Sequence, residues 1–201
     1  MIDKQFDQGT VHIFHYIIAS ADMYYTEEGQ CDVFLGRDEY GRIHIWGQTA
    51  NTDSSTRIEL CQVFLEYGLY CSAWCTAAEA HYHMQNFGER LGHGLAKYMR
   101  NCPDLLGSDN PALYALEQIF ESIGADFSTD YLSEGVQLRM ARCPVQEAAK
   151  HSGMRHVDLA RDGMSAMCRS LVLDMNPHSI VDTSPDSSSE FIVTIRAAEP
   201  A

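Results

Sequence analysis

The stretch from Cys71 to His83 holds the densest group of chemically capable side chains in the sequence. It reads CSAWCTAAEAHYH, so two cysteines, a glutamate and two histidines fall within thirteen residues. If one helix runs through it, neighbours four residues apart share a face, with about 5–6 Å between their Cβ atoms. The residues that recur at this step are Cys71, Cys75, Glu79 and His83. They are candidate ligands for zinc or another transition metal, taken two at a time, because twelve residues of helix rise about 18 Å.

A tetrahedral site on this helix would need further ligands from elsewhere in the chain, such as His93, Cys102 or Cys143. The alternative is that Cys61 and Cys75 are small core residues, as free cysteine commonly is, while His81 and His83 lie at a solvated helix end. The spacing is compatible with both interpretations. It therefore does not decide whether the protein binds a metal cofactor.

A second group surrounds Cys143, in the segment RMARCPVQEAAKHSGMRH. Cys143 follows an expected strand and Pro144 begins a short helix, so the helix dipole and Arg142 would stabilise the thiolate. This position predicts a reactive cysteine of low pKa. Two alternatives stay open: Cys143 could converge with His156 and Cys168 on a metal, or it could be a buried residue at a strand end.

If Cys143 is a nucleophile, it needs a base, and the base needs a group to orient it. The histidines that follow it are His151 and His156, and the acidic residues beyond them are Asp158 and Asp162. The candidate catalytic set is therefore Cys143, His156 and Asp158.

The amino-acid composition limits the kinds of partner that the protein is expected to bind. The chain has 201 residues, 45% of them hydrophobic, with 14 basic against 28 acidic residues and a net charge of −14. Such a balance does not neutralise phosphates, which argues against nucleic acid and against an anionic membrane surface. No apolar run is long enough to span a bilayer, and no export signal is visible. The seven cysteines are an odd number, which favours reduced thiols in a cytoplasmic protein over a disulfide framework.

The pattern of residues predicts an α+β protein with its helices packed on one face of a mostly antiparallel sheet. Residues 1–53 are expected to be an extended region with a hairpin that turns at 38–41. Residues 54–201 are expected to form an α+β ligand-binding domain. Together the two regions are expected to form one compact unit. Its expected helices cover residues 54–75, 83–101, 108–126 and 157–176, the first of them capped by Ser54 or Ser55. Its expected strands cover residues 134–143, 178–183 and 190–197.

Particular residues support these assignments. Asn110 can cap a helix that Pro111 begins and Gly124 ends. Gly88 and Gly92, four residues apart, would share a helix face and let another backbone come close.

The second half of the chain resembles the small-molecule-binding domain named after the vinyl reductases. The resemblance rests on FGERLGHGLA, on a helix ending ESIGADF, on a strand running into CP, on a helix carrying DGMSAMC, and on a closing strand pair. The CP followed by a later helix cysteine is also similar to hydrolases acting on 2-amino-thiazoline-carboxylic acid. The resemblance implies an α+β fold, a homodimer, and a pocket between sheet and helices with Cys143 and Cys168 near it. The last strand carries no cysteine, unlike the vinyl-reductase pattern.

We therefore expect the protein to bind a small, partly apolar organic molecule in a pocket between helices and sheet. The expected ligand-binding residues are Trp74, Cys75, His83, Phe87, Met140 and Cys168. The alternative function is that of a small-molecule hydrolase or lyase with a cysteine nucleophile or a metal bound by cysteine and histidine.

Overall fold

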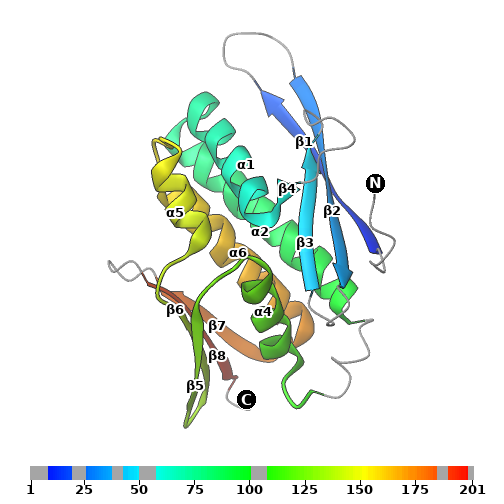
Figure 1. The fold of residues 1–201 in the computed structure, drawn as a ribbon, viewed down its shortest axis with the longest axis vertical. Helices are drawn as coiled ribbons and strands as arrows, with labels where there is room; N and C mark the ends of the chain where they lie inside the picture. Colours follow the sequence, from blue (N-terminus) through cyan, green and yellow to red (C-terminus); the bar gives the residue numbers. More distant parts are fainter. Residues whose placement is uncertain are drawn as a thin grey trace.

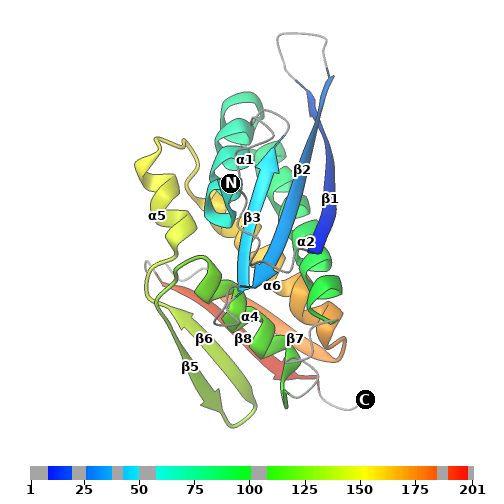
Figure 2. The same cartoon turned by 45° about the vertical axis from the view of Figure 1, so that its right-hand side comes forward.

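The structure of the protein, a computed structural model, describes residues 9–19, 26–37, 43–49, 58–100, 108–184 and 190–198. For the strands up to residue 59 it describes the backbone. The structure has two antiparallel sheets of four strands, and Figures 1 and 2 show them on different sides of the central helices. The α+β class is confirmed, with two sheets where the sequence analysis expected one.

The first sheet has the order β1-β2-β3-β4 and is built from the N-terminal strands. Its strands are β1 (Gly9–Ala19), β2 (Thr26–Arg37), β3 (Ile43–Thr49) and the short β4 (Ile58–Glu59). The expected hairpin is the antiparallel pair β2–β3, in which Val33 lies opposite Gly47 and Leu35 opposite Ile45. Its turn at 38–41 lies outside the described residues.

The helices begin after β4. They are α1 (Leu60–Trp74), α2 (Ala77–Met99), α4 (Pro111–Ser122), α5 (Pro144–His151) and α6 (Asp158–Met175). The first helix was expected to begin at residue 54, but Ile58 and Glu59 pair with β3 and the helix begins after them. Ser54 and Ser55, the expected caps, lie outside the described residues. The cap of α4 is confirmed, because the Asn110 side chain accepts a hydrogen bond from the backbone N–H of Leu113.

The second sheet has the order β5-β6-β8-β7. Its strands are β5 (Phe127–Leu132), β6 (Gly135–Met140), β7 (Ser179–Ser184) and β8 (Phe191–Ala197). On β6 the residues Val136, Leu138 and Met140 are buried, as their alternation predicts. Strand β5 was not expected. It lies at the edge of the sheet and pairs only with β6 there. Most of its side chains are exposed, so its sequence shows little hydrophobic alternation.

Helices α2 and α6 run parallel and in close contact through the centre of the molecule. A Cβ atom added to Gly88 would lie 2.0 Å from the carbonyl oxygen of Gly163, and one added to Gly92 would lie 2.4 Å from that of Met167. The two glycines therefore let the backbone of α6 approach α2, as their spacing predicts. Helix α1 folds back on α2, with Phe64 and Tyr67 packed against the ring of Phe87.

Candidate functional site

The Cys71–His83 stretch is divided between two helices. Helix α1 ends at Trp74 and α2 begins at Ala77. Between them, Thr76 donates from its backbone N–H and its hydroxyl to the Glu79 carboxylate at 2.9 and 2.7 Å. The Glu79 backbone N–H donates back to the Thr76 hydroxyl. This is a capping box, written in the sequence as T-A-A-E, and it ends the run of fourth-residue spacing.

The capping box also engages Glu79, one of the four candidate metal ligands. Hydrogen bonds from Thr76 hold the pKa of the Glu79 carboxyl below its ordinary value, since they favour its charged form. That carboxylate accepts hydrogen bonds at the start of α2, whereas Cys71 lies near the end of α1. In the part of the chain that the structure describes, no three cysteine, histidine or acidic side chains come together to hold a metal ion.

Cys71 and Cys75 are close to each other at the end of α1. Burial raises the pKa of the Cys71 thiol to about 12, and the neighbouring Cys75 adds to the rise. Burial, followed by the charge of Glu79, raises the pKa of Cys75 as well. Both cysteines therefore stay protonated thiols at neutral pH. Cys71 is a core residue, whereas Cys75 and Cys61, the two expected core cysteines, are partly buried and pack against the core.

The expectation of a low pKa at Cys143 is wrong. Cys143 does lie at the start of α5, as predicted, with its side chain 1% exposed. Burial raises the pKa of its thiol, and this outweighs the opposing backbone N–H groups of Gln146 and Val145 and the charge of Arg161. Cys168 is fully buried near it, and burial and then the proximity of Cys143 raise its pKa. A helix terminus lowers a thiol pKa where water reaches the thiol, and here the desolvation is larger.

The other expected ligand-binding residues differ widely in their exposure to solvent. Trp74 is 48% exposed at the end of α1, whereas Phe87, Met140 and Cys168 are core residues. His83 lies beside the exposed ring of Tyr82. Of the expected catalytic set, Asp158 is exposed in the first turn of α6.

His156 instead lies close to a histidine–aspartate pair that joins α2 to α6. The Nδ1 atom of His81 and an Oδ atom of Asp162 are 2.5 Å apart, and both side chains are about one third exposed. The ring centroids of His156 and His81 are 6.4 Å apart. Further along the same two helices, Nδ1 of His93 and an Oδ atom of Asp174 are 2.7 Å apart. Two such pairs therefore link α2 and α6 on either side of the glycine contact.

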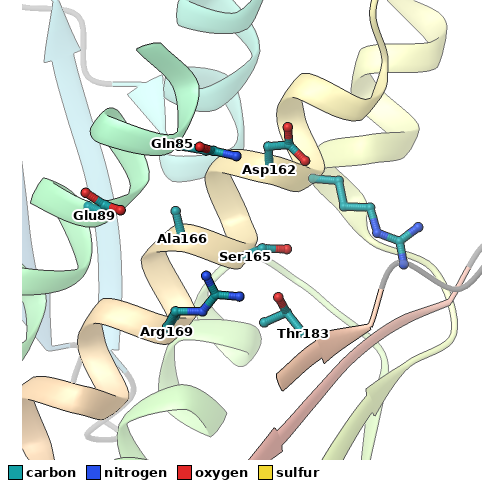
Figure 3. A pocket seen from close by; sticks show the side chains of 8 residues that line it. Gln85, Glu89, Asp162, Ser165, Ala166, Arg169 and Thr183 are labelled. Atoms are coloured by element: carbon teal, nitrogen blue, oxygen red, sulfur yellow. The ribbon is translucent and has the colours of Figure 1, made fainter. Parts of the chain in front are cut away.

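A cavity of about 220 Å³ opens beside Asp162, between α2, α6 and the edge strand β7. Figure 3 shows its lining side chains. Two arginines and two acidic residues line it together with three uncharged polar residues and one alanine: Gln85, Glu89, Arg161, Asp162, Ser165, Ala166, Arg169 and Thr183. An Nη atom of Arg161 donates to the backbone carbonyl of Glu190 at 2.9 Å, which holds this guanidinium in place. Among the described residues, Arg169 and Glu89 have neither a hydrogen bond nor an ion pair.

Sequence reasoning missed most of this cavity. Of its lining residues, Asp162 alone was considered, as an alternative to Asp158. No motif marks the others, since they come from two helices and a strand that meet through the parallel packing of α2 and α6. The glycine pair at 88 and 92 was the available signal for that packing, but it does not reveal which helix the partner is.

Comparison with known proteins adds no relative: the chain matches no family model, no curated protein and no solved structure. No helix of the described residues is long and apolar enough to cross a membrane.

Proposed function

We propose that this protein binds a small polar molecule carrying an acidic group, a carboxylate or a phosphate, in the cavity between α2, α6 and β7. The observation that carries the proposal is Arg169, which lines the cavity and has no partner among the described residues. A guanidinium group pairs well with the two oxygens of a carboxylate or phosphate. Arg161, already held by the Glu190 carbonyl, adds a second positive charge at the same cavity.

The size and chemistry of the cavity define the ligand further. A volume of about 220 Å³ is below the roughly 300–1,000 Å³ of pockets for drug-sized molecules, so the ligand is of metabolite size. The lining is mostly charged and polar. We therefore propose a polar ligand in place of the partly apolar one that the sequence led us to expect. The position between helices and a strand is of the kind that the resemblance to vinyl-reductase-type domains implies.

A thermal-shift screen with small carboxylates and inorganic phosphate tests the proposal. A ligand at about 100 times its dissociation constant stabilises the native state by about 2.7 kcal/mol, a readily measured shift. Arg169→Gln should weaken the binding of any stabilising acid about tenfold. Arg142→Gln removes the same charge from an exposed residue outside the cavity lining and should leave binding unchanged. Equal affinities in the two variants would move the binding site away from this cavity.

A hydrolase or lyase is the second candidate, and the His81–Asp162 pair favours it. A histidine whose Nδ1 is bonded to a carboxylate is oriented for proton transfer, and Asp162 also lines the cavity. The buried, protonated Cys143 does not support the cysteine nucleophile of the earlier expectation. Assays with 4-nitrophenyl acetate and 4-nitrophenyl phosphate, comparing the wild type with His81→Ala, test this candidate. Equal rates for the two proteins would dismiss it.

We also propose that the protein is a cytoplasmic homodimer. The five cysteines whose side chains are described are free thiols, which is typical of a reducing compartment. The dimer rests on the family resemblance. Sedimentation velocity at micromolar concentration tests it, and a single monomeric species would refute it.

A further inference from the structure

Two of the charged residues of the cavity, Glu89 and Arg169, are of opposite sign and are not paired with each other. Glu89 comes from α2 and Arg169 from α6, and Figure 3 shows the two side chains apart from each other. Opposite charges this close to one cavity commonly form an ion pair across it, but these two do not, and each lacks any other partner among the described residues. Two side chains of opposite charge are therefore available to one ligand.

The second acidic residue of the cavity is fixed in place. The oxygen of Asp162 that meets Nδ1 of His81 at 2.5 Å is engaged, which orients the carboxylate and leaves its other oxygen without a described partner. Asp162 and Glu89 together place two carboxylates at the cavity, against the guanidinium groups of Arg161 and Arg169. The charges of the lining therefore sum to zero.

A neutral charge sum disfavours a ligand that is purely anionic. Such a ligand would gain from the arginines but would be repelled by the two carboxylates that line the same cavity, in a protein whose net charge is already −14. A purely cationic ligand would meet the converse repulsion. A molecule with one positive and one negative group can pair with the carboxylates and with the arginines at once. The polar groups of Gln85, Ser165 and Thr183 can form hydrogen bonds with the rest of that molecule.

Resting on the proposed function, we infer that the ligand is a zwitterion of the α-amino-acid class. Its carboxylate pairs with Arg169, beside Arg161, and its ammonium group pairs with Glu89 and the free oxygen of Asp162. His81 acts as a positioning residue that holds Asp162 toward the ammonium group. The volume of about 220 Å³ suits a small amino acid with a polar side chain.

The test uses matched ligands at low ionic strength. The standard L-amino acids are screened by thermal shift. The affinity of each amino acid that stabilises the protein is then compared by calorimetry with the affinities of two analogues, the acid that lacks its amino group and the amine that lacks its carboxylate. For serine these analogues are 3-hydroxypropanoate and ethanolamine. We expect the amino acid to bind at least about tenfold more tightly than either analogue. Glu89→Gln should weaken binding of the amino acid about tenfold and should not weaken binding of the deamino acid, which loses a repelling charge, whereas Arg169→Gln should weaken both.

Glu134→Gln is the control for Glu89→Gln, since it removes an exposed carboxylate in the turn between β5 and β6, outside the cavity lining. It should bind the amino acid as the wild type does. A deamino acid that binds as tightly as its amino acid would overturn the zwitterion while leaving the acid-binding proposal in place. A failure of every amino acid, carboxylate and phosphate to stabilise the protein would overturn both.

Discussion

Replacing Gly88 by alanine tests whether the close contact of α2 and α6 builds the centre of this fold. The added Cβ would lie 2.0 Å from the carbonyl oxygen of Gly163, where ordinary contact begins at 3.4 Å, so the backbones must separate by more than an ångström. The obstacle is backbone, which cannot rotate away as the end of a long side chain can. Overpacking of this kind costs typically about 1–3 kcal/mol, occasionally more, and here we expect at least the upper value.

Helix propensity acts in the opposite direction. Alanine is favoured over glycine in a helix interior by about 1 kcal/mol, so Gly88→Ala should be destabilised by a net of about 2 kcal/mol. The free energy of unfolding is measured by urea denaturation followed by circular dichroism at 222 nm. Lys97→Gly and Lys97→Ala, at an exposed position of the same helix, give the propensity difference separately, because both lose the same lysine.

The sign of the effect decides the interpretation. If Gly88→Ala is as stable as the wild type or more so, propensity alone explains it and α6 does not lie against α2 as described. The same variant should weaken ligand binding, because α2 and α6 each contribute side chains to the cavity and the substitution moves them apart.

Three further predictions concern the caps and the thiols. Thr76→Ala removes the hydroxyl of the capping box and should destabilise the protein by about 1 kcal/mol in the same urea assay; an unchanged midpoint would refute the cap. The folded pKa of Glu79 lies below its unfolded value, so its contribution to stability is present above the unfolded pKa near 4.3 and is lost as the pH falls through the folded pKa. The Glu79→Gln variant should therefore differ in stability from the wild type at pH 6, and the difference should shrink as the pH is lowered below the unfolded pKa. Among the cysteines with described side chains, Cys75 should be alkylated by iodoacetamide well before Cys143 and Cys168, as peptide mass spectrometry can measure, and fast labelling of Cys143 in the native protein would contradict its burial.

Local features of this fold could be predicted from the sequence. The helix that Asn110 caps, the alternating strand β6 and the glycine contact of α2 each depend on a few neighbouring residues, and each is found in the structure. The one-helix interpretation of the Cys71–His83 stretch failed because it ignored the T-A-A-E capping signal. Strand β5 was missed because an edge strand buries little and so carries little hydrophobic alternation.

The candidate site could not be predicted in the same way. His81 and Asp162 are 81 residues apart, and their contact depends on the register of two parallel helices. The cysteines attracted attention because of their chemistry, but Cys143 and Cys168 are buried in the core. The charged residues of the cavity looked like ordinary surface residues in the sequence, since no spacing pattern connects Glu89 to Arg169.

A crystal structure of the protein with the most strongly stabilising amino acid tests the central claim most directly. We predict density for the ligand between α2, α6 and β7, with its carboxylate on Arg169 and its ammonium group between Glu89 and Asp162. Density for the amino acid elsewhere in the molecule, with the cavity free of ligand at saturating concentration, would contradict the account.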